Sequence, residues 1–101
     1  MKILAIEKEL EIINWSTEQD ILKDEARSVY KMYLAGYLRE IYFNEHNCAV
    51  LILECESKDI AIELLSSLPL FEKKLISFEL MELNPYTGYG RIMDNSKNMG
   101  N

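Results

Sequence analysis

Residues 37–55 read YLREIYFNEHNCAVLILEC. Two runs rich in apolar residues, 37–43 and 48–54, flank the polar segment Asn44-Glu45-His46-Asn47, whose residue types tolerate turn geometry. Apolar runs on both sides of a short polar segment are typical of a β-hairpin. We therefore expect two antiparallel strands joined by a short turn.

A helical pattern lies on each side of this hairpin. Before it, Ser16 or Thr17 is the expected N-cap of a helix that ends at Gly36. After it, Ser57 is the expected cap of a second helix, which ends at Pro69. The first helix has an apolar face that we expect in the core, formed by Leu22, Ala26, Val29, Tyr30 and Tyr33.

Two further strands are expected at residues 2–8 and 75–83. The resulting order, β-α-β-β-α-β, is that of a ferredoxin-like α+β fold, in which two helices cover one face of a four-stranded antiparallel sheet. In this fold the last strand lies beside the first. We assign residues 1–92 to one such domain and expect residues 93–101 to form a flexible tail.

The composition limits the partners and cofactors. The net charge of -6 disfavours nucleic acid and anionic membrane as partners. No apolar run approaches the ~20 residues of a membrane span, and Glu7 comes too early for a signal peptide, which predicts a cytoplasmic protein. Cys48 and Cys55 fall on opposite faces of one strand and cannot pair, and no metal-ligand spacing surrounds the single histidine, His46. We expect free thiols, no metal site and no cofactor.

Both faces of the sheet are apolar in the strand at 48–54. Val50 and Ile52 point to one face, and the other face receives Ala49, Leu51 and Leu53. The chain has no further element to cover the second face, and an exposed apolar patch of this size is uncommon in a soluble monomer. We expect a second copy of the chain to cover it, which would give a homodimeric α+β barrel with a cavity between the two sheets.

The parity of each strand predicts which residues face the helices. The more uniformly apolar sets are assigned to the helix-packed core, and they are Leu4, Ile6, Ile41, Phe43, Ile76, Phe78 and Leu80. The opposite sets are assigned to the cavity between the sheets, and they are Ile3, Ala5, Glu7, Leu38, Glu40, Tyr42, Ser77, Glu79 and Met81.

Three carboxylates and one phenol would then project into an apolar cavity. On adjacent strands, Glu7 and Glu79 would approach to about 5–8 Å. Burial and mutual repulsion would raise the pKa of each carboxyl toward values useful for proton transfer near neutrality. In the alternative, these glutamates lie at strand ends, solvated or paired with Lys2, Lys8 or Arg39.

Five segments of the chain resemble the muconolactone isomerase-like family, and they are LREIYF at 38–43, AVLILEC at 49–55, LPLF at 68–71, ISFE at 76–79 and PYTGY at 85–89. The resemblance extends from Met1 to about Arg91. It implies the ferredoxin-like fold and association as a dimeric α+β barrel, with larger rings in the isomerase itself. It also implies a reaction that takes a proton from one carbon of an unsaturated lactone and returns one to another carbon.

Such a reaction needs a base, a group that stabilises the developing enolate oxygen, and a dry pocket. The candidate catalytic residues are Glu40, Glu79, Tyr42 and Glu7, with Glu40 or Glu79 as the base and Tyr42 or Arg39 at the oxygen. The candidate substrate-binding residues are Arg39, His46, Trp15, Leu51 and Met81. Arg39 has the opposite parity to Glu40, so both reach the cavity only if the strand bulges.

Two features have alternative interpretations. His46 is either a general base at the mouth of the barrel or a solvated turn residue. Trp15, Tyr86 and Tyr89 either form a lid, or the arm that carries the two tyrosines packs on a neighbouring subunit.

Three hypotheses for the function follow. The first is a cofactor-independent isomerase or cyclase that acts by proton transfer on an unsaturated lactone, an enol or a polyketide-like molecule. The second is a non-catalytic homo-oligomer that binds a small apolar ligand or serves as a scaffold. The third is a cofactorless monooxygenase of an activated phenol or quinol.

Overall fold

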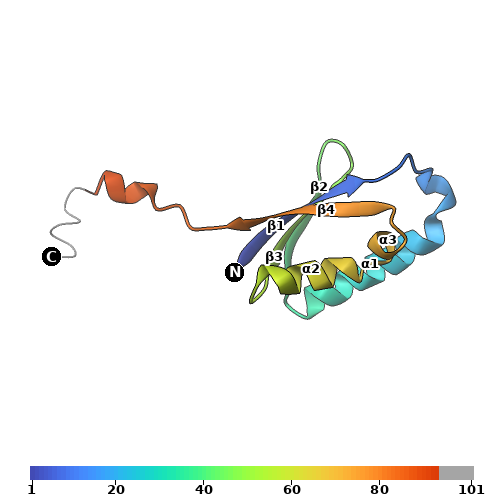
Figure 1. Cartoon of the computed structure of the whole chain (residues 1–101), viewed down its shortest axis with the longest axis horizontal. Helices are drawn as coiled ribbons and strands as arrows, with labels where there is room; N and C mark the ends of the chain where they lie inside the picture. The colour runs from blue at the N-terminus through green and yellow to red at the C-terminus, as the bar shows by residue number, and fades with distance from the viewer. Residues whose placement is uncertain (94–101) are drawn as a thin grey trace.

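The computed structural model describes residues 1–93 (Figure 1). Its elements are β1 (Lys2–Glu9), the 3₁₀ helix η1 (Trp15–Thr17), α1 (Gln19–Leu34), β2 (Leu38–Phe43), β3 (Ala49–Glu54), α2 (Lys58–Ser66), α3 (Pro69–Glu72), β4 (Ile76–Leu83) and the 3₁₀ helix η2 (Gly88–Arg91). The predicted β-α-β-β-α-β order is confirmed, with the short elements η1, α3 and η2 added. Of the predicted tail, 94–101 lies outside the described residues.

The four strands form one antiparallel sheet in the order β2-β3-β1-β4, so β4 lies beside β1 as predicted. All three α-helices lie on the same side of this sheet (Figure 1). The fold is therefore the expected ferredoxin-like α+β arrangement. We call the side under the helices the covered face and the opposite side the open face.

The core lies between the covered face and the helices. Its largest fully buried side chains are Ile3, Leu51, Leu53, Leu65, Leu68 and Ile76. Met32 of α1 and Ala61 of α2 complete the contact between helices and sheet. Burial of these apolar side chains is the main source of stability.

The predicted faces hold for β4 and fail for β1. Ile76, Phe78 and Leu80 pack in or against the core, as expected. In β1, however, Ile3 and Ala5 are the residues in the core. Apolar residues occupy both parities of this strand, so hydrophobicity alone could not distinguish its two faces.

In β2 the assignment of Leu38 to the cavity between the sheets is wrong, and the cause is different. The pairing of β2 with β3 shifts register between Leu38 and Glu40, which marks a bulge at Arg39. The bulge places Leu38 in the core on the same side as Ile41, although the strict parity of the strand put them on opposite faces. Glu40 and Tyr42 keep the predicted side, the open face.

The open face carries two rows of paired side chains. One row consists of Tyr42, Val50, Ile6 and Glu79, and the next of Glu40, Ile52, Leu4 and Met81. No helix in residues 1–93 covers these rows (Figure 1). The predicted apolar second face is therefore present, with carboxylates at its margins.

Local signals fix the helix ends. Gly36 follows α1 with a φ of 88°, a conformation that favours glycine, and the Ser57 side chain accepts a hydrogen bond from the Ile60 N–H at the start of α2. Both of these predictions are confirmed. The predicted caps Ser16 and Thr17 instead lie inside η1, which Asn14 caps.

The arm after β4 runs away from the domain and ends its described part in η2 (Figure 1). Tyr86 and Tyr89 pack edge to face with ring centroids 4.9 Å apart, and both are exposed. Among the described residues, no helix combines the length and apolar character needed to cross a bilayer.

Candidate active site

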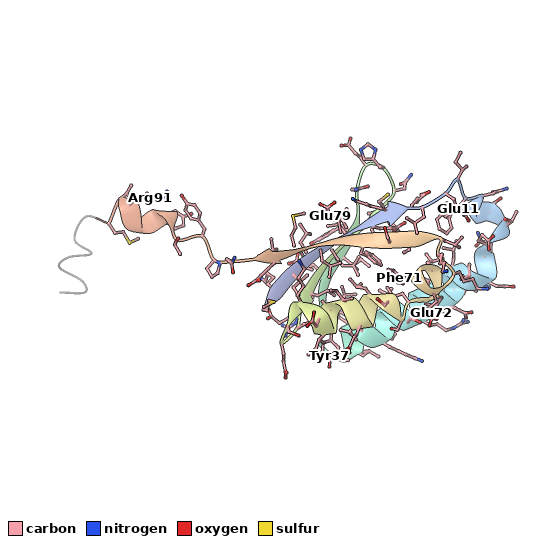
Figure 2. All side chains as sticks on the ribbon, viewed as in Figure 1. Glu11, Tyr37, Phe71, Glu72, Glu79 and Arg91 are labelled. Atoms are coloured by element: carbon pink, nitrogen blue, oxygen red, sulfur yellow. The ribbon has the colours of Figure 1, made fainter. Side chains whose placement is uncertain are left out.

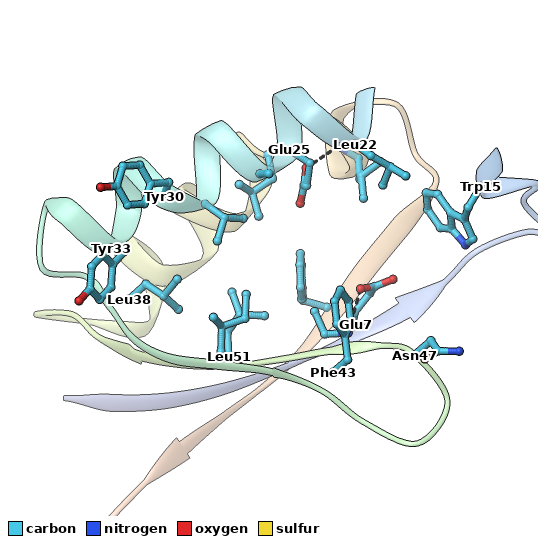
Figure 3. Close-up of a pocket in the computed structure, with 17 residues that line it drawn as sticks. Glu7, Trp15, Leu22, Glu25, Tyr30, Tyr33, Leu38, Phe43, Asn47 and Leu51 are labelled. Atoms are coloured by element: carbon cyan, nitrogen blue, oxygen red, sulfur yellow. Dashed lines mark hydrogen bonds between the residues drawn. The ribbon is translucent and has the colours of Figure 1, made fainter. Parts of the chain in front are cut away.

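A pocket of about 660 Å³ separates α1 from the covered face of the sheet (Figure 3). Its wall is formed by Glu7, Trp15, Leu22, Glu25, Ala26, Val29, Tyr30, Tyr33, Leu38, Ile41, Phe43, Asn47, Ala49, Leu51, Leu68, Leu70 and Phe78. The apolar face predicted for the first helix thus lines a pocket. Its tyrosines are more than half exposed, so the prediction that they lie in the core is wrong.

The mouth of the pocket lies between α1 and the edge strand β2. The large apolar lining residues with the greatest exposure come from these two elements: Phe43 is 77% exposed, and Tyr30 and Tyr33 are 59% and 58% exposed. Deeper lining residues such as Leu51 and Leu68 are buried. A small molecule would enter over the edge strand and meet the sheet beneath α1.

Glu7 is a buried carboxyl on the floor of this pocket. It lies on β1, is only 9% exposed, and its Oε1 accepts a hydrogen bond from the backbone N–H of Ala49 at 2.9 Å. Burial raises the pKa of Glu7, against the lowering effect of that hydrogen bond. This carboxyl is therefore protonated at a higher pH than an exposed glutamate would be.

Glu25 enters the pocket from the opposite wall. It lies on α1, and its Oε1 accepts a hydrogen bond from the backbone N–H of Leu70 at 3.0 Å, which ties α1 to α3. Burial is the largest cause of its raised pKa, the bond to Leu70 opposes it, and the negative charge of Glu7 raises it further. Figure 3 shows the two carboxyl groups on opposite sides of the space between α1 and the sheet.

Two titratable carboxyls with raised pKa values in one apolar pocket are an arrangement suited to proton transfer. A protonated carboxyl can donate a proton, and a carboxylate in the same pocket can accept one. Desolvated charge also acts more strongly on a bound molecule than charge in water.

Three of the nine candidate residues from the sequence come together in this pocket: Glu7, Trp15 and Leu51. Trp15 is carried by η1, just before α1, and closes the end of the pocket near Glu7 (Figure 3). The other six candidates lie outside the lining.

Four of these six candidates lie on the open face or its margin. Tyr42 donates a hydrogen bond to Glu40 at 2.9 Å, and Glu79 forms an ion pair with Lys8 at 2.8 Å. The hydrogen bond and charge of Lys8 lower the pKa of Glu79. Figure 2 shows Glu79 on the side of the sheet away from the helices, and Met81 shares its parity on β4.

The expected approach of Glu7 to Glu79 is wrong. Glu7 pairs with Phe78, and Glu79 pairs with Ile6. Because alternate residues of a strand point to opposite faces, the two carboxylates lie on opposite sides of the sheet. The carboxyl that faces Glu7 is Glu25.

Arg39 and His46 are held near the two ends of β2. The Nε of Arg39 donates to the carbonyl oxygen of Gly36 at 2.9 Å. His46 lies in the hairpin turn, where its backbone N–H donates to the Asn44 side chain at 2.9 Å.

Sequence reasoning missed Glu25, although a signal was present. Glu25 is three residues after Leu22 and four before Val29, so it lies within the apolar face of the helix. A single charged residue inside an apolar face marks a buried carboxyl or a functional one.

In residues 1–93, the side chains of Glu7, Glu9 and Cys48 bring three potential metal ligands within 4.8 Å of one another. Burial raises the pKa of the Cys48 thiol, and the charges of Glu7 and Glu9 add to the rise. Exposed acidic side chains such as Glu9 often lie together without a metal. We assign no metal to this cluster.

No protein-family profile and no curated protein matches the chain. Solved structures with the same fold include muconolactone isomerase, with a TM-score of 0.72 and 17% identity over 86% of this chain and 92% of that one. They also include the 5-chloro-2-hydroxyhydroquinone dehydrochlorinase of Burkholderia phenoliruptrix AC1100 in complex with 2,5-dihydroxybenzoquinone, with a TM-score of 0.60 and 14% identity over 87% and 98% of the two chains.

Proposed function

The muconolactone isomerase-like fold expected from the sequence is confirmed, and from this fold we propose a function. We propose that the chain is an enzyme that works without a cofactor and transfers a proton within a small, enolisable ring molecule. The observation that carries the proposal is the pair Glu7 and Glu25, a buried and a half-buried carboxyl with raised pKa values on opposite walls of an apolar pocket.

The two carboxyls would divide the work. One, as the carboxylate, takes a proton from a carbon next to a carbonyl group. The other, protonated, donates a hydrogen bond to the carbonyl oxygen as negative charge develops there. Return of the proton to a different carbon completes an isomerisation. Attack of the enolate carbon on a second carbonyl, whose oxygen then takes the proton from the carboxyl that removed it, would complete a cyclisation.

The similar structures support this chemistry. One is an isomerase, and the other is a dehydrochlorinase in complex with 2,5-dihydroxybenzoquinone. Both are enzymes, and the second holds a small oxygenated ring. A pocket of about 660 Å³ has room for a molecule of that class.

Exchange of carbon-bound protons with solvent tests the proposal directly. In deuterium oxide, the protein should accelerate exchange at the α-carbons of 2-tetralone, a neutral bicyclic ketone, as followed by proton NMR. Glu7→Gln and Glu25→Gln should each slow this catalysed exchange at least a hundredfold, since general acid–base groups contribute about 10²–10⁴-fold.

Glu63→Gln is the matched control, since Glu63 lies exposed on α2 outside the pocket, and it should keep the wild-type rate. Wild-type rates in both pocket variants would contradict the proposal. A ketone that binds and never exchanges would favour the non-catalytic alternative, and oxygen consumption would favour the monooxygenase.

The open face is a second possible location for the proposed reaction, and it carries most of the other predicted site residues. The hydrogen bond between Tyr42 and Glu40 leaves a polar pair on the open face, with Glu79 on the same face. A second copy of the chain over this face would enclose them. Loss of exchange in Glu40→Gln and Glu79→Gln, with full exchange in the pocket variants, would transfer the proposal to that cavity.

We further propose that the chain forms a homodimer through the open face and that the arm at 84–93 packs on a neighbouring copy. The apolar rows of the open face and the exposed Tyr86 and Tyr89 support this assembly. The proposed location is the cytoplasm, where the free thiols of Cys48 and Cys55 would stay reduced.

A further inference from the structure

The charges of the pocket wall restrict which molecules it can hold, and this restriction deepens the proposed function and rests on it. Glu7 and Glu25 are the charged residues in the wall. None of the lysines, the arginines or the histidine within residues 1–93 belongs to it. The pocket therefore offers an entering anion two carboxyl groups and no counter-charge.

Two cations that neighbour these carboxyls along the chain have partners elsewhere. Lys8 follows Glu7 on β1, but it pairs with Glu79 on the open face. Arg27 follows Glu25 on α1 by two residues and pairs with Asp24 at 2.9 Å on the solvent side of the helix. A negatively charged ligand would thus lose its hydration without gaining an ion pair in this wall.

The walls match a flat ring. Aromatic side chains are present at the far end, the mouth and the floor, and they are Trp15, Tyr30, Tyr33, Phe43 and Phe78. Rings of this kind bind other rings by stacking or edge-to-face contact. Between them the wall is aliphatic, with small residues such as Ala26 and Ala49 leaving the space open.

The carboxyls set the position of polar groups on that ring. Glu7 and Glu25 each use Oε1 for a backbone N–H, at 2.9 and 3.0 Å. Within the described residues no side-chain oxygen is left both buried and without a hydrogen bond, so the second oxygen of each carboxyl is accessible or bonded. Since the two carboxyls lie on opposite walls, a ring between them needs one polar group toward each.

We propose that the pocket selects an uncharged, flat ring compound with hydroxyl or carbonyl groups on opposite edges, and that it rejects the same ring bearing a carboxylate. Glu7 and Glu25 act as the selecting residues because they repel an anion and accept or donate hydrogen bonds to the two polar groups. The substrate class is thus a dihydroxyarene or its cyclic enol or dione tautomer.

A matched pair of probes tests the selection. The probes are 2,5-dihydroxybenzamide and 2,5-dihydroxybenzoate, which have the same ring, the same two hydroxyl positions and nearly the same size, and differ in charge at pH 7. Isothermal titration calorimetry on the full chain gives both affinities. The indole N–H resonance of Trp15, the only tryptophan, reports whether binding occurs at the pocket.

We expect the amide to bind at least tenfold more tightly than the carboxylate and to shift the Trp15 resonance. In the double variant Glu7→Gln/Glu25→Gln, the preference should fall below threefold, mainly through tighter binding of the carboxylate. Glu63→Gln should keep the wild-type ratio. Because glutamine keeps the shape and the hydrogen-bond acceptor of glutamate, circular dichroism of the double variant should match the wild type.

Equal or tighter binding of the carboxylate by the wild type would overturn the inference, and so would binding of neither probe at millimolar concentration. If the double variant fails to fold, the ratio of the two affinities is measured in each single variant instead. The proposed function has a different point of failure: a protein that prefers the amide but never exchanges the protons of 2-tetralone selects neutral rings without proton-transfer activity.

Discussion

Glu7 on β1 and Glu25 on α1 face each other across the pocket, and each accepts a hydrogen bond from a backbone N–H of another element. Ala49 at the start of β3 holds the first, and Leu70 in α3 holds the second. Their carboxyl groups are therefore fixed before any ligand arrives. Such pre-organisation favours proton transfer because no ordering is left for the reaction step.

The raised pKa values predict how stability changes with pH. Burial raises the pKa of Glu7 and Glu25 above 4.5, so the unfolded chain loses these two protons at a lower pH than the folded chain does. Their contribution to stability is complete below pH ~4.5 and is lost as the pH rises through the folded-state pKa values. Because glutamine is neutral throughout, Glu7→Gln and Glu25→Gln should gain stability relative to the wild type between pH 4 and 7.

For Glu79→Gln we expect the opposite change of stability with pH. Lys8 lowers the pKa of Glu79, so its contribution is present above pH ~4.5 and is lost as the pH falls through the folded-state value. This variant should lose stability relative to the wild type as the pH rises, by a small amount because the pair is exposed. Thermal denaturation at several pH values measures the stability of all three variants. A difference in stability from the wild type that does not change with pH, for Glu7→Gln and Glu25→Gln, would contradict the raised pKa values of this pair.

The sequence was sufficient for the element order and for most boundaries because the signals there are local. Gly36, Ser57 and the Asn44–Asn47 turn act on the backbone beside them. The faces of β1 could not be derived in the same way. Its two parities are both apolar, and which of them is covered depends on packing against helices far along the chain.

The candidate site depended on that missing step. Once Glu7 was assigned to the open face, its expected partner became Glu79, and Glu25 had no role. The bulge at Arg39 likewise comes from how β2 pairs with β3, a relationship between strands that a single strand does not encode. Trp15 and Leu51 line the pocket under α1, whereas they were expected at a cavity between two sheets, and their role in binding a substrate stays a prediction.

The end of α1 predicts a cost for one added methyl group. Gly36 has a φ of 88°, and a Cβ there would meet no atom within 4 Å, so the whole cost of Gly36→Ala comes from the backbone conformation. We expect a loss of about 1–2 kcal/mol in the free energy of unfolding. Gly90→Ala is the matched control, since its Cβ is equally free of contacts and its φ is not in the left-handed region. Chemical denaturation measures the free energy of unfolding of both variants. Equal values for Gly36→Ala and Gly90→Ala would contradict the left-handed conformation of Gly36.

The contact between α2 and the sheet predicts a larger effect. Leu65 is 1% exposed and lies in the core, whereas Ile62, one turn earlier on the same helix, is 44% exposed. Leu65→Ala should cost about 2–5 kcal/mol because it leaves a cavity. Ile62→Ala should change the free energy of unfolding by about 1 kcal/mol or less. Reversal of this order in urea denaturation would mean that α2 presents its other face to the sheet.

The open face predicts the outcome of a charge substitution at Met81. This residue is 41% exposed on the edge strand β4 and pairs with Leu4, which itself pairs with Ile52, so a lysine would lie at the end of an apolar row. In the proposed dimer two lysines would enter the interface, because a two-fold interface uses the same surface of both subunits. Met81→Lys should therefore weaken the dimer at least tenfold, as measured by analytical ultracentrifugation.

Ile62→Lys carries the same charge at nearly the same exposure, 44%, on the helical side, and should leave the dimer intact. A wild-type protein that stays monomeric at tens of micromolar would contradict the proposed dimeric barrel. Dissociation caused by Ile62→Lys and not by Met81→Lys would show that the dimer forms through the helices.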